Sequence, residues 1–237
     1  MNLTGHTKRG FSSLFVDGLD DFIEVDLGSI VSGLDSEFTL VFSAKKTAPN
    51  ANQTIYGAYV AGPSTNDRSI LWNWETGNNL RFIIRDGASA RVWTTSVVPN
   101  SGSDNIITLA VSALNNTVEM TANGVVLTLV SSSVVPNPIQ DQSFFTPRLF
   151  SNSDALGGVV NAFRGDFYHF AAYNRILTSG EISTLNQGFA KHEPNFEINA
   201  SDLHIQSYTG SNVYSLEDVY SGSTYQTTNV SLNSVES

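Results

Sequence analysis

Alternation of hydrophobic and polar residues is the dominant pattern in this chain. Residues 38–44 alternate cleanly, and Phe38, Leu40, Phe42 and Ala44 fall on one face. A period of two residues predicts a β-strand that is buried on one side. Similar stretches occur at residues 13–17, 22–26, 69–75, 80–85, 90–96, 105–112, 117–122, 125–130 and 163–173. The pattern therefore predicts an all-β protein.

Turn-forming dipeptides separate these strands and join them into hairpins. Asn123-Gly124 lies between two alternating stretches, and Asp86-Gly87 lies between two others. Asn-Gly favours a tight hairpin because both of its residues readily adopt positive φ. Strands joined by such short turns run antiparallel, so we expect antiparallel meanders.

One short helix is predicted after the last of these strands. Thr178 as N-cap and Glu181 three residues later form a capping box. Ile182 and Leu185 provide the apolar side of the helix, and Gly188 ends it. Together with the strands, this predicts an antiparallel jelly-roll sandwich of two sheets, with one short helix near the C-terminal end of the core.

The composition changes after Lys191. We place a sandwich domain at residues 1–190 and an acidic arm at residues 191–237. Within this arm, residues 192–237 contain six acidic residues and no Lys or Arg. The arm is rich in Tyr, Ser and Gly, and its spaced tyrosines would suit docking on a neighbouring subunit. The alternative is a polar, partly extended tail without a partner. The tyrosines in question are Tyr208, Tyr214, Tyr220 and Tyr225.

Charge and composition exclude several classes of function. A net charge of −10 repels phosphate backbones, so we expect no nucleic-acid partner. No apolar run is long enough to insert into a membrane, and the absence of cysteine removes disulfides and sulfur-based zinc sites. Residues 1–15 show no signal-peptide pattern. We therefore expect that the protein leaves the cell by another export route or inside a virus particle, or that this chain is a fragment of a longer protein.

Two segments resemble the laminin G-like branch of the concanavalin A-like superfamily. Residues 14–23 are similar to its opening strand pair, and residues 163–182 to its closing signature of Phe-x-Gly, Tyr-Asn-Arg-x-Leu and a Glu-Ile helix. The resemblance spans residues 10–190 and implies a jelly roll whose first and last strands lie side by side. The family usually has an acid where this chain has Tyr168, which weakens the expectation of a metal.

Aromatic residues of the first meander are candidates for stacking on sugar rings. Nearby polar side chains would bind the hydroxyl groups. The ligand-binding residues that we predict are Trp72, Trp74, Trp93, Tyr56, Asn73 and Arg91. The alternative is that the aromatic side chains fill the core, because a sandwich needs such residues inside. A sugar would then bind the loops at one end, at residues 50–56 and 62–68.

Acidic residues suggest two further chemistries. Asp17, Asp20 and Asp21 form an oxygen-rich loop that would suit a structural calcium ion, and we expect no other cofactor. The alternative is that these acids cap a turn. Glu24 and Asp26 share a strand face, as paired carboxyl groups do in glycoside hydrolysis. The laminarinase-type members carry a third acid on this strand, which is missing here, so we expect no catalytic residues.

These features predict a binding protein rather than an enzyme. The first hypothesis is a lectin-like or adhesive module on an extracellular or virion surface, with a glycan or other protein subunits as partners. We expect it to be oligomeric or part of a larger assembly. The first alternative is a purely structural decoration or fibre protein of a bacteriophage. The second is a polysaccharide-cleaving enzyme of the glucanase type.

Overall fold

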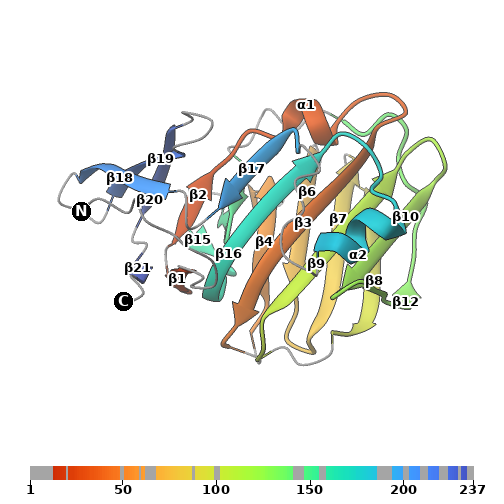
Figure 1. Cartoon of the computed structure of the whole chain (residues 1–237). Helices are drawn as coiled ribbons and strands as arrows, with labels where there is room; N and C mark the ends of the chain where they lie inside the picture. Colours follow the sequence, from red (N-terminus) through yellow and green to blue (C-terminus); the bar gives the residue numbers. More distant parts are fainter. Residues whose placement is uncertain are drawn as a thin grey trace.

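Two antiparallel β-sheets pack face to face in the computed structural model of the chain (Figure 1). The structure describes residues 13–19, 21–48, 51–58, 60–61, 68–86, 89–98, 102–140, 147–154, 159–185, 194–199, 203–208, 213–218, 224–228 and 231–233. The two-sheet antiparallel sandwich predicted from the alternation is confirmed. Within the described ranges, neither helix is long and apolar enough to cross a membrane.

Sheet A runs in the order β11-β10-β9-β3-β16-β1-β21, and β17 also pairs with β16. Its strands are β1 (Ser13–Asp17), β3 (Glu37–Lys46), β9 (Asn105–Ser112), β10 (Thr117–Ala122), β11 (Val125–Val126), β16 (Arg164–Tyr173), β17 (Phe196–Asn199) and β21 (Ser231–Asn233). In β1 and β16, Leu14 lies opposite Phe167 and Asp17 opposite Arg164. The two segments that carry the family resemblance are therefore neighbouring strands, as predicted.

Sheet B runs in the order β12-β8-β7-β6-β4-β13-β2-β20-β19-β18. Its strands are β2 (Phe22–Glu24), β4 (Gln53–Ala58), β6 (Arg68–Trp74), β7 (Asn79–Asp86), β8 (Ser89–Val97), β12 (Leu129–Ser131), β13 (Arg148–Leu149), β18 (Leu203–Tyr208), β19 (Val213–Asp218) and β20 (Thr224–Thr228). A small third sheet consists of β5 (Val60–Ala61), β14 (Asn152–Asp154) and β15 (Val159–Val160).

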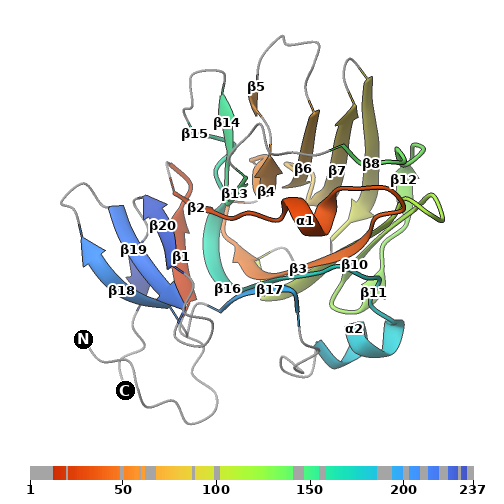
Figure 2. The same cartoon turned by 90° about the horizontal axis from the view of Figure 1, so that it is seen from above.

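The core lies between the two sheets. The predicted inward face of β3, which is Phe38, Leu40, Phe42 and Ala44, has no exposed surface. Aromatic rings fill much of this space, and the rings of Phe42 and Phe163 meet edge to face with 5.3 Å between their centroids. Figure 2 shows α1 (Gly28–Val31) at one open end of the sandwich, between the two sheets.

The glycine of the Phe-x-Gly signature is required by close packing of two strands. A Cβ atom at Gly165 would overlap the carbonyl oxygen of Lys45 on β3, and Gly165 has a φ of 156°. Only glycine allows β16 to approach β3 this closely. The Asn123-Gly124 hairpin is also confirmed, with φ values of 50° and 77°.

Residues 125–130 differ from the single strand predicted for them. They divide into β11 in sheet A and β12 in sheet B, and the chain crosses from one sheet to the other between them. Leu127, at this crossing, is buried in the core. The alternating pattern persists through the crossing, so the pattern alone does not reveal the change of sheet.

The predicted helix is α2 (Ser179–Leu185), and its capping box is confirmed. The backbone N–H of Thr178 donates to Glu181 Oε2 at 2.8 Å, and the backbone N–H of Glu181 donates to Thr178 Oγ1 at 3.3 Å. The expected helix end at Gly188 lies outside the described residues. Figure 2 places α2 against the outer face of sheet A.

The segment after residue 191 continues both sheets in the part of the chain that the structure describes. β17 pairs with β16, and Ile198 is buried in the core. β20 pairs with β2, and β21 pairs with β1. In the β18–β19 hairpin Tyr208 lies opposite Tyr214, and Tyr225 is on β20. Tyr220 lies outside the described residues. Docking of these tyrosines on another subunit stays a prediction.

Candidate functional site

The predicted sugar-stacking aromatics lie inside the sandwich. Tyr56, Trp72 and Trp74 have no exposed surface, and Trp93 is 2% exposed. In this arrangement they fill the core, which is the alternative that the sequence left open, and their rings do not reach a ligand outside. Burial raises the pKa of the Tyr56 hydroxyl, which therefore stays neutral. Arg91 is half-buried on β8, opposite Ile84 of the core.

Asn73 points away from these aromatics. It lies between Trp72 and Trp74 on β6, and alternate residues of a strand face opposite sides, so its side chain is on the outer face of sheet B. Its neighbours across the strands are Thr54 on β4 and Arg81 on β7. Asn73 is only 4% exposed, yet its Oδ1 has no hydrogen-bond partner among the described residues. An acceptor of this kind is costly to bury unless a further group binds it.

Arg148 is a second polar residue on this face. Leu149 beside it is buried in the core, so the Arg148 side chain is on the outer side of β13, between Glu24 of β2 and Gly57 of β4. Its guanidinium carbon lies 4.0 Å from the ring centroid of Phe22. The nearest carboxylate contact is long, at 3.8 Å between Nη2 and Glu24 Oε1.

The guanidinium of Arg148 keeps unused hydrogen-bonding capacity. Its side chain is only 12% exposed, and neither Nε nor Nη1 has a partner among the described residues. Burial lowers the pKa of Arg148 from its ordinary value, and the charge of Glu24 acts in the opposite direction. An arginine stays protonated in proteins despite such a shift, so this group is a desolvated cation with free N–H donors.

A ledge formed by residues 151–154 borders this face. A Cβ atom at Gly57 would lie 3.0 Å from Asn152 Cβ and 3.1 Å from the Ser151 carbonyl oxygen, so the ledge crosses directly over β4. Thr54 Oγ1 donates to Asn152 Oδ1 at 3.1 Å. Ser151 Oγ is buried without a described partner. We call Thr54, Asn73, Arg81, Arg148, Ser151 and Asn152 the outer B face.

Three charged residues, Arg81, Glu75 and Lys46, meet at the β6–β7 turn beside the outer B face. Arg81 Nη1 lies 3.2 Å from Glu75 Oε1. Lys46 reaches across from sheet A, and its Nζ donates to the carbonyl oxygens of Trp74 at 3.3 Å and Glu75 at 2.8 Å. Burial lowers the pKa of Lys46 to about 8, although the negative charge of Glu75 acts to raise this pKa. These contacts hold the end of β6 in place.

The predicted calcium loop uses its acids to form a turn. Asp17 Oδ1 accepts from the Leu19 N–H at 2.8 Å, and Asp21 Oδ2 accepts from the Asp17 N–H. These are the turn contacts named as the alternative. Asp20 lies outside the described residues, and no group of three metal-ligating side chains occurs among the residues that are described.

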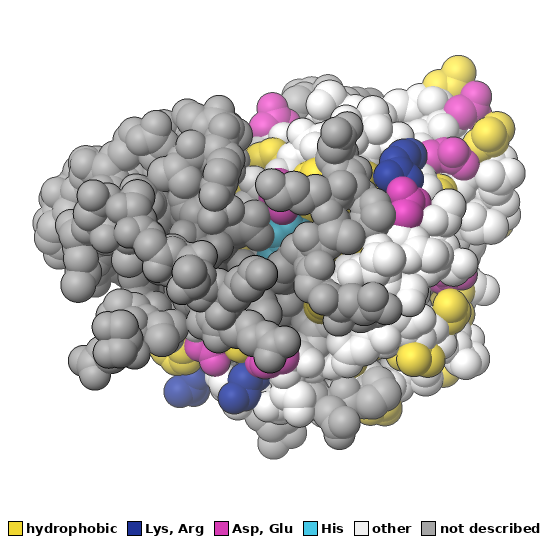
Figure 3. All heavy atoms as spheres, viewed as in Figure 1, with side chains coloured by type: hydrophobic (Ala, Val, Ile, Leu, Met, Phe, Trp, Pro, Cys, Tyr) yellow, Lys and Arg dark blue, Asp and Glu magenta, His cyan; other side chains and the backbone are white. Residues whose placement is uncertain are grey.

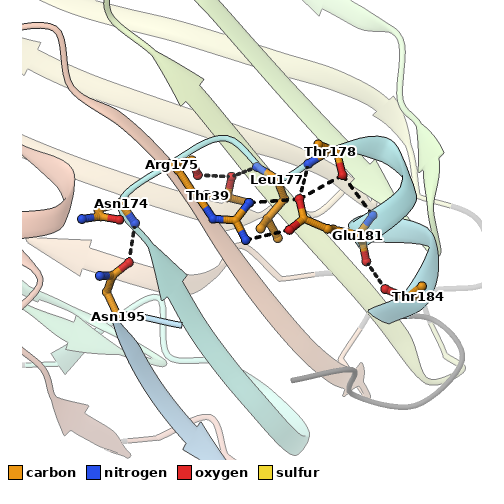
Figure 4. Close-up of polar contacts among 8 residues, drawn as sticks. All are labelled: Thr39, Asn174, Arg175, Leu177, Thr178, Glu181, Thr184 and Asn195. Atoms are coloured by element: carbon orange, nitrogen blue, oxygen red, sulfur yellow. Dashed lines mark hydrogen bonds and ion pairs between the residues drawn. The ribbon is translucent and has the colours of Figure 1, made fainter. Parts of the chain in front are cut away.

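The outer face of sheet A contrasts with the outer B face. There α2 covers a second apolar cluster that includes Val41, Tyr173 and Ile182. Figure 4 shows how polar groups around α2 pair with one another: Arg175 donates to both oxygens of Glu181, at 3.0 and 2.7 Å. Figure 3 shows this side of the molecule, where charged side chains are sparse among neutral polar atoms.

Sequence reasoning identified only part of the outer B face. Asn73 was predicted as a ligand-binding residue, and Arg81 lies in the stretch 80–85, whose alternation predicted a strand. Arg148, Ser151 and Asn152 were missed, because β13 and β14 are too short to show a period. The sequence offered one signal for Arg148: this arginine directly precedes the apolar pair Leu149-Phe150.

Comparison with known proteins places this architecture among jelly-roll sandwiches that include carbohydrate-binding modules. No model of a known protein family matches the sequence, and no curated protein is significantly similar to it. Solved structures do match the fold. The CBM40 of the Ruminococcus gnavus IT-sialidase, solved bound to α2,3 sialyllactose, has 16% identity and a TM-score of 0.58, and the match covers 74% of this chain and 96% of the module.

Two further structures have the same architecture. A putative carbohydrate-binding protein from Bacteroides ovatus has 12% identity and a TM-score of 0.66; the match covers 98% of this chain and 62% of that protein. A heptameric SAP-like pentraxin from Limulus polyphemus has 11% identity and a TM-score of 0.52, with 79% and 90% covered. At these identities the likeness shows the fold. Membership of the laminin G-like branch stays a prediction.

Proposed function

We propose that this protein is a non-catalytic, lectin-like module that binds an acidic glycan on the outer B face. The observation that carries the proposal is Arg148, a desolvated guanidinium whose Nε and Nη1 have no described partner. Arginine binds carboxylates through two parallel N–H donors, and such bonds are stronger than neutral ones. A sugar carboxylate is a ligand that this group suits.

Other groups of the outer B face suit the rest of a sugar. Asn73 Oδ1 is an acceptor for a hydroxyl group. The flat ring of Phe22 holds the guanidinium in position through a cation–π contact. A site made of a few placed polar groups on a rigid sheet is typical of small-ligand recognition.

Relatives of this fold support the proposal. The Ruminococcus gnavus CBM40 was solved with sialyllactose, which carries a carboxylate, and the Bacteroides ovatus protein is described as a putative carbohydrate-binding protein. Fold likeness alone does not define a ligand, so the argument depends on Arg148. A non-catalytic role fits the sequence, where the third acid of the glucanase-type strand is missing after Glu24 and Asp26.

The module would act at an extracellular or virion surface as one component of a larger assembly. The absence of cysteine, the low content of charged residues and the acidic C-terminal segment motivate this part of the proposal. Mass spectrometry of surface proteins or purified particles from the source would test it: recovery of the chain with other structural proteins supports it, and recovery only inside cells contradicts it.

A matched pair of arginine variants tests the glycan site. Binding of the wild type to sialyllactose and to lactose is measured by calorimetry, and a glycan array containing uronic-acid and neutral oligosaccharides extends the comparison. We expect acidic glycans to bind and neutral ones to bind at least about tenfold more weakly. Arg148→Met should remove this preference, whereas Arg175→Met, which changes an arginine on the opposite face, should keep it.

Three results would contradict the proposal. Equal binding of acidic and neutral glycans would show that the guanidinium is not the recognition group. Loss of binding in both arginine variants would show a general effect of charge or stability. A chain that binds no glycan on the array is not a lectin of the kind proposed.

A further inference from the structure

The side of the sandwich opposite the C-terminal strands has two short edge strands. In the described part of the chain β11 is the last strand of sheet A and β12 the last of sheet B at this side (Figure 1). They are joined by only two residues, so both sheet edges come together here. An edge strand presents unpaired N–H and C=O groups that a further strand can bind.

This side is also apolar. Val125 is 65% exposed, Val126 59%, Val130 67% and Val134 59%. Val97 of β8, whose strand pairs with β12, is 60% exposed. Figure 3 shows exposed hydrophobic side chains on this side of the molecule. Exposed apolar residues that gather along an edge, as Val125, Val126 and Val130 do on β11 and β12, are typical of an interaction site, whereas isolated ones are ordinary.

The segment that forms this edge contains no charged residue. Residues 120–140 contain no Asp, Glu, Lys or Arg, although the whole chain has a net charge of −10. Proteins usually protect edge strands with charged residues, above all lysine. Neither β11 nor β12 contains a charged residue or a proline.

We propose that this valine edge, consisting of Val97, Val125, Val126, Val130 and Val134, binds the same edge of a second copy of the chain. Two copies of an acidic protein repel each other, and an uncharged surface is where they can approach with the least repulsion. A contact between identical patches related by a two-fold axis is the commonest way in which proteins form dimers. Pairing across the axis would extend both sheets and bury the valines.

The proposal is independent of glycan binding, because the outer B face and the valine edge are different parts of the molecule. In a dimer the two glycan sites would be presented together, which strengthens binding to a surface that carries several glycans. The oligomeric state can be measured without any ligand. Failure of one proposal therefore leaves the other standing.

Sedimentation equilibrium of the full chain over a range of concentrations tests the dimer. We expect the mass to approach twice that of the chain as concentration rises. The double variant Val126→Lys/Val130→Lys should weaken the dimer by about tenfold or more, because each new charge is introduced twice at a two-fold contact. Higher ionic strength should tighten the wild-type dimer, since salt screens the repulsion between acidic copies.

The matched control is Leu19→Lys. Leu19 is 75% exposed in the turn between β1 and β2, on the side of the C-terminal strands, so this variant should associate like the wild type. If the lysine variant unfolds, Val126→Thr/Val130→Thr keeps β-branched residues and should weaken the dimer less strongly but measurably. A wild type that stays monomeric at high concentration, an assembly larger than a dimer, or equal weakening by Leu19→Lys would overturn the proposal.

Discussion

Two arginines on opposite outer faces of the sandwich, Arg175 and Arg148, are in opposite situations. Arg175 beside α2 is 44% exposed and donates to both oxygens of Glu181. Arg148 on the outer B face is 12% exposed, and its nearest carboxylate oxygen is 3.8 Å away. Arg175 therefore binds a carboxylate through two hydrogen bonds, whereas Arg148 makes only a long contact with one.

This difference distinguishes a stabilising face from a binding face. Around α2, polar groups bind one another: Thr39 Oγ1 donates to the Arg175 carbonyl oxygen at 2.9 Å and accepts from the Leu177 N–H at 3.0 Å. On the outer B face, Asn73 and Arg148 are buried with unused capacity. Burying a charged group whose N–H donors lack partners costs stability, so such a group is expected where a ligand completes it.

The largest effect on stability is expected from Ile182→Ala. Ile182 is 5% exposed in the apolar cluster that holds α2 on sheet A. Truncating a buried isoleucine costs about 2–4 kcal/mol, so the free energy of unfolding should fall by about that amount in urea denaturation. The folded variant should bind glycan as the wild type does. A variant that unfolds like the wild type would show that α2 does not stabilise this face.

Arg148→Met should have the opposite signature. The free energy of unfolding should stay within about 1 kcal/mol of the wild type or rise, because an apolar side chain replaces a desolvated, loosely paired charge. Binding of an acidic glycan should weaken by about ten- to a hundredfold, which corresponds to the loss of a charge-assisted hydrogen bond. Chemical denaturation and calorimetry measure the two quantities. A loss of stability without a loss of affinity would reverse the assignment of the two faces.

Glu181→Gln should produce a smaller effect that depends on pH. The hydrogen bonds from Arg175 lower the pKa of Glu181 from 4.5 to about 2. A carboxyl group with a lowered pKa stabilises the fold fully above its unfolded pKa, and that stability is lost as pH falls from about 4.5 to about 2. The pair is partly exposed, so the loss is on the order of 1 kcal/mol or less. Thermal unfolding between pH 2 and 7 should show a smaller acid-induced decrease in the variant.

Local patterns predicted much of the fold. The β9 and β10 boundaries match the alternating stretches, and the capping box of Thr178 and Glu181 fixed the start of α2. The strands β13 to β15 were not predicted, because strands of two or three residues do not show a period. Pairing of the C-terminal strands with β1 and β2 depends on contacts between the two ends of the chain, which alternation does not encode.

The candidate site was less predictable than the fold. Trp72 and Trp74 are apolar, large and regularly spaced, which fits a core and a sugar platform equally well, and only the structure places them inside. Asn73 lies between the two tryptophans, and it was predicted to bind a ligand because of that position. Asn73 lies near the ledge because Thr54, its neighbour on β4, donates a hydrogen bond to Asn152. Thr54 and Asn152 are 98 residues apart in the sequence.

The smallest expected effect is that of Asn73→Ala, and it tests whether the outer B face is one site. Asn73 is neutral, so losing its free Oδ1 should weaken binding of an acidic glycan only by a few-fold, consistent with a single neutral hydrogen bond of about 1 kcal/mol. Stability should be unchanged or slightly higher, since an unsatisfied buried acceptor is removed. Combined with Arg148→Met in a double-mutant cycle, the losses of affinity should be non-additive if both side chains bind the same sugar. Additive losses would place the two residues in separate sites, and the outer B face would then not be a single binding surface.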